Sequence, residues 1–318
     1  MAQPRSQLAP PGAPGIFHCV QRCVRRAFLC GIDRYTGQSY EHRKHWVEAR
    51  IRLLAECFAV SIHAYAVMSN HLHLVVQVDP VIASDWPDDE VAARWVRLFP
   101  PREDDDVAVA EKCARLLANP LRLETIHARL ADLSWLMRCL AEPIARRANR
   151  EDACKGRFWE GRFKAQRLCD QRALLAAMAY VDLNPIRAGI AERLEDSAHT
   201  SVAARIAECR VEPQTLTAQL RPLLGVTRMP MTLSNSDYLQ LLDWTGRQLH
   251  PGKRGRIATD APDALHAIDT DPARWTARVK GIGNGYWRAV GTAADLLALA
   301  EAIGQRWLKG FGFAARMG

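Results

Sequence analysis

The sequence lacks paired cysteines, a glycine-rich phosphate-binding loop and any long apolar run. Its 9 cysteines include no C-x-x-C pair, so a structural zinc site built on cysteine is not expected. Their odd number and wide spacing are typical of a reducing compartment, where most cysteines pack as small apolar residues. No segment resembles a signal peptide or a transmembrane helix, and no internal repeat is present. We therefore expect a cytoplasmic protein without membrane contact.

Positive charge exceeds negative charge in this chain. The 318 residues include 43 lysines and arginines against 35 aspartates and glutamates, which gives a net charge of +8 and a pI near 9.2. A basic excess attracts nucleic acid because phosphates release their counterions on binding. The length, with 48% hydrophobic residues, allows one sizeable core and a second, smaller unit.

Two histidines share one face of an expected strand. Residues 62–68 are mostly apolar, Ser69-Asn70 suits a tight turn, and residues 74–78 are again mostly apolar, which predicts a hairpin. Successive side chains of a strand point to opposite faces, so His71 and His73 converge on one side. Neutral imidazole is the commonest protein metal ligand, although many histidine pairs only pack or face water.

A helix is expected to end near Pro185. Residues 171–180 contain strong helix formers and neither glycine nor proline, and Pro185 disfavours helical conformation at Asn184. Tyr180 and Asn184, four positions apart, then lie on one helix face, where a phenol and a carboxamide oxygen can reach one site. A core Tyr180 with Asn184 as a helix cap is the alternative, which the local sequence alone favours.

A basic and aromatic segment leads directly into this helix. Between Arg146 and Arg172, Phe158, Trp159 and Phe163 are interleaved with arginines and lysines, a mixture typical of surfaces that stack bases and clamp phosphates. A solvated basic face with the aromatic rings turned into the core explains the same composition. The position of the segment beside the helix favours the nucleic-acid interpretation.

The order of expected elements indicates an α+β fold. A strand at about 16–22 is followed by a helix at about 40–58, the histidine hairpin, and helices that end near Asn184. This order fits a ferredoxin-like fold with an antiparallel sheet. Apolar spacing at 108–117 and 121–140 predicts a helical insertion, and the region from residue 196 onward is expected to be mainly helical.

Three motifs resemble those of the HUH single-tyrosine transposases, in particular the branch of REP-associated tyrosine transposases. In chain order they are MSNHLHLVV (68–76), GRFWEGRFKAQ (156–166) and MAYVDLNPIRAGI (178–190). The resemblance covers most of residues 16–195, apart from a poorly matched middle.

This resemblance implies a metal-dependent enzyme that cleaves and rejoins single-stranded DNA. Tyr180 would be the nucleophile, forming a 5′-phosphotyrosine link and a free 3′-hydroxyl. His71, His73 and Asn184 would hold a divalent ion, Mg²⁺ or Mn²⁺. An unperturbed tyrosine has a pKa of about 10, so a nearby cation must favour its phenolate at neutral pH. The phosphotyrosine conserves the energy of the broken bond, so no nucleotide cofactor is required.

The resemblance also implies a DNA partner, domain bounds and a possible homodimer. The DNA would be single-stranded and hairpin-containing, and the chain would have a catalytic domain (16–195) with an insertion at about 81–150 and a C-terminal region (196–318). Residues 1–15 are rich in proline and glycine, which predicts a flexible tail. In a homodimer the tyrosine of one chain could meet the histidines of the other. The residues expected to contact DNA are Arg157, Phe158, Trp159, Arg162, Phe163, Lys164 and Arg187.

Two other functions remain open at the level of sequence. A domesticated, non-catalytic nucleic-acid-binding protein on the same fold predicts salt-sensitive binding without a metal-dependent product. A metal-dependent phosphoesterase that uses water in place of Tyr180 would release its product without a protein adduct. The remaining histidines, including His18, His45 and His199, are assigned no catalytic role.

Overall fold

A six-stranded sheet forms the centre of the structure, a computed structural model that describes residues 5–24, 29–33, 36–103, 105–225, 232–249, 261–283 and 287–317. The strand order is β5-β2-β3-β1-β4-β6. Neighbouring strands are antiparallel except β4 and β6, which run parallel. The strand bounds are Gly15–Arg22 (β1), Val60–Val67 (β2), His71–Val78 (β3), Lys164–Leu168 (β4), Leu224–Gly225 (β5) and Ala289–Val290 (β6).

Four of these strands and two helices form a ferredoxin-like unit. Helix α2 (Arg43–Cys57) connects β1 to β2, and α7 (Leu133–Glu151) precedes β4. Strands β2 and β3 form the expected hairpin, with β1 lying between β3 and β4. This succession of elements and this strand order are those of the ferredoxin-like fold, so the prediction of an α+β class is confirmed.

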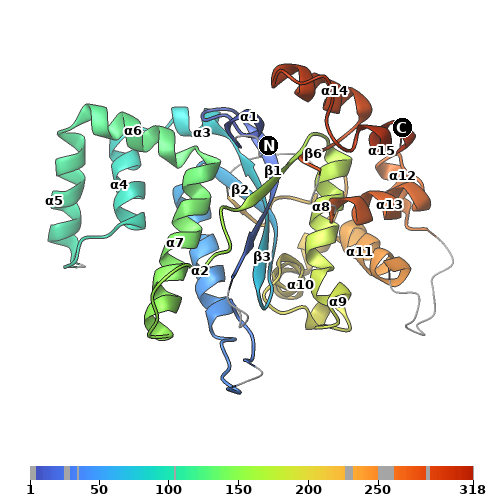
Figure 1. Cartoon of the computed structure of the whole chain (residues 1–318), viewed down its shortest axis with the longest axis horizontal. Helices are drawn as coiled ribbons and strands as arrows, with labels where there is room; N and C mark the ends of the chain where they lie inside the picture. The colour runs from blue at the N-terminus through green and yellow to red at the C-terminus, as the bar shows by residue number, and fades with distance from the viewer. Residues whose placement is uncertain are drawn as a thin grey trace.

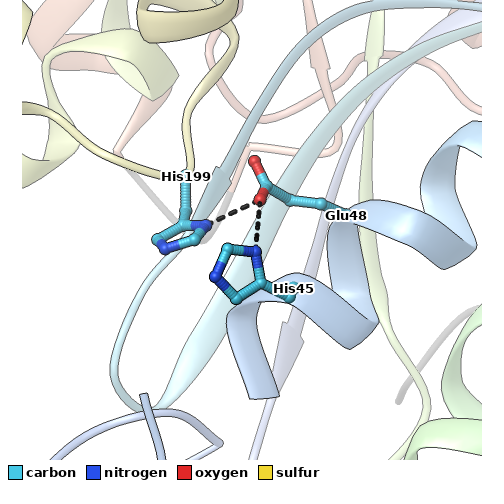
Figure 2. A group of neighbouring side chains, drawn as sticks. All are labelled: His45, Glu48 and His199. Atoms are coloured by element: carbon cyan, nitrogen blue, oxygen red, sulfur yellow. Dashed lines mark hydrogen bonds and ion pairs between the residues drawn. The ribbon is translucent and has the colours of Figure 1, made fainter. Parts of the chain in front are cut away.

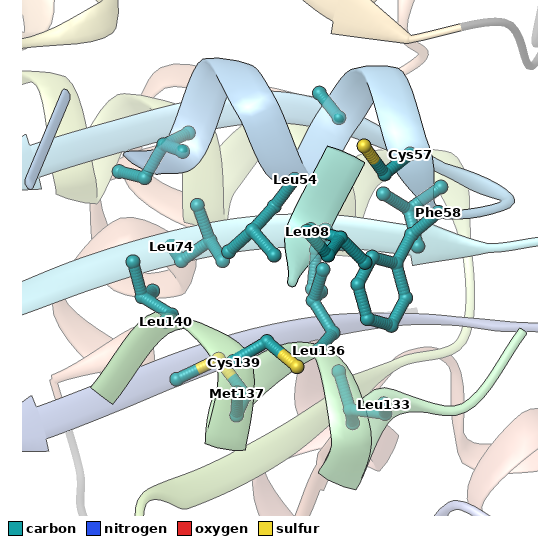
Figure 3. Close-up of a cluster of buried hydrophobic side chains, with 14 of the residues drawn as sticks. Leu54, Cys57, Phe58, Leu74, Leu98, Leu133, Leu136, Met137, Cys139 and Leu140 are labelled. Carbon is teal, nitrogen blue, oxygen red and sulfur yellow. The ribbon is translucent and has the colours of Figure 1, made fainter. Parts of the chain in front are cut away.

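Helices α2 and α7 cover one face of the sheet (Figure 1). Leu74 of β3 meets Leu54 of α2 and Leu136 of α7 in a core that excludes water (Figure 3). The expected helical insertion extends this layer between β3 and β4. It consists, with α7, of α3 (Pro80–Ser84), α4 (Asp88–Leu98), α5 (Asp106–Leu117) and α6 (Pro120–Leu130).

Helix α8 (Gln171–Asp182) covers the opposite face. Its residues from Ala173 to Ala179 are all buried, because the C-terminal region packs on the side of α8 that faces away from the sheet. That region is mainly helical, as expected, and it supplies the edge strands β5 and β6. Its α-helices are α10 (Ser201–Val211), α11 (Asn235–Leu249), α12 (Asp263–Ala267), α13 (Pro272–Ile282), α14 (Ala293–Ala302) and α15 (Phe311–Met317), and α9 (Asn184–Arg187) precedes them.

The first fifteen residues require a correction where the structure describes them. Residues Arg5–Leu8 form α1, and Leu8 is buried. The Arg167 guanidinium donates a hydrogen bond to the Leu8 carbonyl at 3.0 Å. Proline and glycine content had suggested a flexible tail, but apolar burial and this hydrogen bond tie residues 5–15 to β4.

No helix in the described part of the chain is long and apolar enough to cross a membrane.

Candidate active site

A cleft of about 530 Å³ opens where the end of β1, the start of β3 and the end of α8 meet. His71, His73, Tyr180 and Asn184 all contribute to its wall. The structure therefore brings together the four residues that the sequence singled out from two distant motifs. The other lining residues are Val20, Arg22, Asn70, Glu160, Gly161, Arg162 and Lys164.

Both histidines of β3 have one ring nitrogen occupied by a neighbour. His71 Nδ1 lies 2.6 Å from Asn70 Oδ1, and His73 Nδ1 lies 2.9 Å from His18 Nε2. If each Nδ1 carries the proton and donates it, each Nε2 keeps a lone pair for a ligand. Metal-binding histidines are commonly oriented by such a second hydrogen bond. The centroids of the His71 and His73 rings lie 4.8 Å apart, and the ring planes are at 80° to each other.

The local environment keeps these imidazoles neutral. Burial, assisted by the charge of Arg22, lowers the pKa of His71 to about 4. Burial and neighbouring positive groups hold the pKa of His73 well below its usual range, and burial lowers that of His18 to about 4. At neutral pH all three rings are uncharged, the form in which imidazole can coordinate a metal.

Tyr180 is half-buried at the cleft, and described residues lie against several sides of its ring. The rings of His73 and His18 lie edge-on to it, with centroids at 5.7 and 5.8 Å. The Arg187 guanidinium lies 4.3 Å from the ring centroid, a cation–π contact. On another side is Gly283, where an added Cβ would lie 2.9 Å from Cε2 and 3.1 Å from the phenol oxygen. Only a residue without a side chain leaves the phenol in this position.

The α8 helix is fixed at both ends. Asp170 accepts a hydrogen bond from the Ala173 N–H at 2.6 Å and so caps the start of the helix. Near the end, the buried Asp182 carboxylate accepts hydrogen bonds from Val202 N–H at 2.9 Å and from the Tyr238 hydroxyl at 2.7 Å. The Ser201 hydroxyl donates to it as well. Burial raises the pKa of Asp182 to about 6, although these hydrogen bonds act in the opposite direction.

Asn184 lies beyond the end of α8 and still reaches the cleft. The structure ends α8 at Asp182 and starts α9 at Asn184, with Pro185 in the first turn, where a missing N–H costs no helix hydrogen bond. Leu183 N–H donates to Ala179 O at 3.0 Å, so the backbone keeps a helical path between the two elements. Tyr180 and Asn184 therefore share one face despite the proline.

The interpretation of the aromatic rings as base-stacking groups is corrected by the structure. Phe158, Trp159 and Phe163 are 2%, 9% and 8% exposed and belong to the core under α2 and α7. Trp159 also donates its indole N–H to Ala141 O at 2.8 Å. The three aromatic rings are buried in the core and are not displayed at the surface, as is usual for aromatic side chains. In this conformation none of the three rings is available to stack on a base.

The basic residues of the same segment are exposed, as expected. Arg162 and Lys164 line the cleft, whereas Arg157 is exposed but is not among the residues that line it. Two residues that the sequence did not assign to the site are Arg22, at the end of β1, and His18. The alternation along β1 carries a signal for His18, because His18 and Val20 face the same side of the sheet.

The residues of the cleft fit a divalent ion. Two neutral imidazole nitrogens and one carboxamide oxygen, from His71, His73 and Asn184, form a mixed donor set that suits Mn²⁺ and Mg²⁺ when phosphate and water complete the shell. In the tautomer in which both Nδ1 atoms donate, the Nε2 atoms are left for this role.

No protein-family model matches this sequence, and no curated protein matches it. A solved structure described as a REP-associated tyrosine transposase bound to a REP hairpin is similar to part of the chain. The alignment covers 72% of this chain and 93% of that one, with 11% sequence identity and a TM-score of 0.35. An identity and a TM-score this low assign no function.

Proposed function

We propose that this protein is a metal-dependent enzyme that cleaves and rejoins single-stranded DNA through a covalent bond to Tyr180. The observation that carries the proposal is the meeting of His71 and His73 with Tyr180 and Asn184 in one cleft. The three sequence motifs that resemble single-tyrosine transposases contribute to this same cleft: the first through the two histidines, the second through Arg162 and Lys164, and the third through Tyr180 and Asn184.

The reaction is a transesterification at a DNA phosphodiester. The Tyr180 oxygen attacks phosphorus, a new O–P bond forms to the 5′ side of the downstream strand, and the bond to the 3′ oxygen breaks. The phenol loses its proton, and the departing 3′ oxygen gains one. Reversal by a 3′-hydroxyl rejoins strands and frees the tyrosine.

Each residue of the cleft has a proposed part in this chemistry. His71, His73 and Asn184 would hold a Mg²⁺ or Mn²⁺ ion, which supplies charge stabilisation at the scissile phosphate. Arg162 and Lys164 would bind the phosphates of the incoming strand, because both side chains are exposed at the cleft. Gly283 and Arg187 hold the Tyr180 ring in place.

The proposed catalytic domain comprises residues 16–195, with an insertion at about 81–150. Residues 196–318 would then support the site, since Gly283 contacts the Tyr180 ring. The histidines and the tyrosine of one chain line the same cleft, so a single chain supplies the full set of residues without a partner. Hairpin-containing single-stranded DNA is the proposed substrate.

The test is an adduct assay with hairpin-containing single strands from the flanks of the gene. A strand labelled at its 3′ end should become covalently attached to the protein in the presence of Mn²⁺, because the protein bonds to the 5′ phosphate of the downstream fragment. The same strand labelled at its 5′ end should yield a free fragment. Tyr180→Phe should abolish both products and retain binding. Tyr40→Phe, with its ring under Arg43 and outside the cleft, is the matched control and should react normally.

Three outcomes would contradict the proposal in different ways. Cleavage at the same position by Tyr180→Phe, with no adduct, would indicate a phosphoesterase that uses water. An adduct retained in that variant would identify another nucleophile. Salt-sensitive binding with no product on any flank, with or without Mn²⁺, would favour a non-catalytic nucleic-acid-binding protein.

A further inference from the structure

A second group of metal-binding side chains lies outside the cleft. His45 and Glu48 project from α2, and His199 comes from the turn that precedes α10 (Figure 2). None of the three lines the cleft of Tyr180. The helix that carries His45 and Glu48 covers the face of the sheet opposite α8, so the group, named here the α2 triad, is distinct from the candidate active site.

The three ligand atoms of the α2 triad already converge. Glu48 Oε2 lies 2.6 Å from His199 Nδ1 and 3.9 Å from His45 Nδ1. Each of the three side chains offers a ligand atom within 4.8 Å of those of the other two. Three ligands at zinc-type bond lengths of about 2.0–2.2 Å lie about 3.4 Å apart. Glu48 and His199 would therefore move apart by about 0.8 Å, and His45, whose side chain is 75% exposed, would move closer to Glu48 by about 0.5 Å.

His199 is held in an unusual backbone conformation that aims it at Glu48. Its φ is 60°, in the left-handed region that residues with a Cβ rarely adopt. Its carbonyl accepts a hydrogen bond from Val67 N–H at 3.1 Å, and the next residue, Thr200, caps α10. Strained conformations of this kind persist where the surrounding structure enforces them, and they gather at functional sites.

A hydrogen bond from Tyr65 also fixes the orientation of the Glu48 carboxylate. The Tyr65 hydroxyl, from β2, donates a hydrogen bond to Glu48 Oε1 at 2.9 Å. This leaves Oε2 directed at the two imidazoles (Figure 2). A hydrogen bond to the second oxygen of a carboxylate ligand is a common support for metal sites. An ion pair between Glu48 and His199 alone would not explain the position of His45, whose Nδ1 also faces Glu48 Oε2.

We propose that His45, Glu48 and His199 bind a divalent transition-metal ion of the zinc class, with water in the remaining position. Two imidazoles and one carboxylate are a donor set that zinc and cobalt accept, in contrast to the oxygen-rich sites of calcium and magnesium. A bound ion would link α2 to the start of α10 across the edge of the sheet beside β2. The inference does not depend on the proposed DNA chemistry.

Cobalt binding tests the α2 triad in the full-length protein. In a His71→Ala/His73→Ala background, which removes the two histidines of the cleft, Co²⁺ titration should give one bound equivalent with visible d–d absorption. Zn²⁺ should displace it. Adding Glu48→Gln or His45→Ala should weaken binding more than about 100-fold, since outer partners alone typically change metal affinity by about 10- to 100-fold. Tyr65→Phe should weaken it by about 10-fold and keep the absorption band.

The controls separate loss of a ligand from loss of the fold. His45 is so exposed that His45→Ala leaves the core intact, and circular dichroism and the melting temperature of the metal-free protein should be unchanged. His266→Ala removes a surface histidine of α12 and should bind cobalt like the background protein. Unchanged affinity in Glu48→Gln and His45→Ala would overturn the proposal. So would the absence of the absorption band at millimolar Co²⁺ and pH 7.5.

Discussion

At the scale of single residues, Gly283 limits where the Tyr180 ring can lie. The first atoms of any side chain at position 283 would overlap the phenol ring. Arg187 and the rings of His18 and His73 border other sides of the phenol ring. The residue that follows α13 thus takes part in the geometry of a cleft whose lining comes mainly from residues before 190.

Replacement of Gly283 by alanine should displace Tyr180, the proposed nucleophile, without unfolding the protein. The new methyl group pushes the phenol away from its present position, and a misplacement of about 1 Å can reduce a rate by about 100-fold. We expect the adduct rate to fall to that extent while DNA affinity and melting temperature stay close to those of the wild type. Gly312→Ala, where an added Cβ would meet only the tip of Arg316 at 3.9 Å, is the matched control. A normal adduct rate in Gly283→Ala would mean that the ring has another productive position.

The residues of the cleft differ in how far the sequence reveals them. His71 and His73 follow from strand alternation, and Tyr180 and Asn184 from helical spacing, because these relations are local. The sequence does not reveal the contact of Gly283 with Tyr180, nor the hydrogen bond between His18 and His73, which are 55 positions apart. Composition also gave the wrong orientation for the aromatic rings, since it does not say which side of a segment faces the core. The catalytic roles of the four residues remain a prediction.

At the scale of elements, local patterns located the strands and helices better than their ends. The apolar spacing of 121–140 suggested one helix, but α6 ends at Leu130 and α7 begins at Leu133. Asp132 accepts a hydrogen bond from Trp135 N–H at 2.8 Å and starts the new helix. Apolar residues continue on both sides of this break because α6 and α7 bury their faces in the same core, so periodicity hides it.

The anchor of α8 on its neighbours should respond to pH through Asp182. Its pKa is raised by burial to about 6 in the folded protein, against 3.8 for an ordinary aspartate. Between pH 3.8 and about pH 6, Asp182 is protonated more often in the folded state than in the unfolded state. Its contribution to the free energy of unfolding is therefore complete below pH 3.8 and is lost as pH rises through about 6. The lost stability is on the order of 3 kcal/mol, from the size of the shift.

The comparison of the wild type with Asp182→Asn isolates this effect. Asparagine stays neutral, so the wild type should lose stability relative to the variant as pH rises from 4 to 7. The buried histidines have lowered pKa values and act in the opposite direction, but they are common to both proteins and cancel. Denaturant unfolding at several pH values measures the difference. A difference that is constant with pH would show that Asp182 is ionised throughout.

At the scale of the whole molecule, the proposed DNA affinity should depend on the exposed cations of the cleft and not on the total net charge of +8. Arg162→Gln and Lys164→Gln should each lower the slope of log affinity against log salt by about 1, because each removes one phosphate contact. Arg122→Gln, on the exposed side of α6, changes the net charge equally and should leave the slope unchanged. Equal effects at all three positions would indicate that affinity follows total charge and that DNA does not enter the cleft.

The two edge strands of the sheet are the last strands to leave the ribosome. β2 and β4 are complete by residue 168, but their outer partners β5 and β6 come only at residues 224–225 and 289–290. At a translation rate of about 5–20 residues per second, the edge of β4 remains unpaired for on the order of ten seconds before β6 is synthesised. Unpaired edges recruit other strands, so the nascent chain is most exposed to aggregation in this interval, and slower translation of the C-terminal region lengthens the exposure.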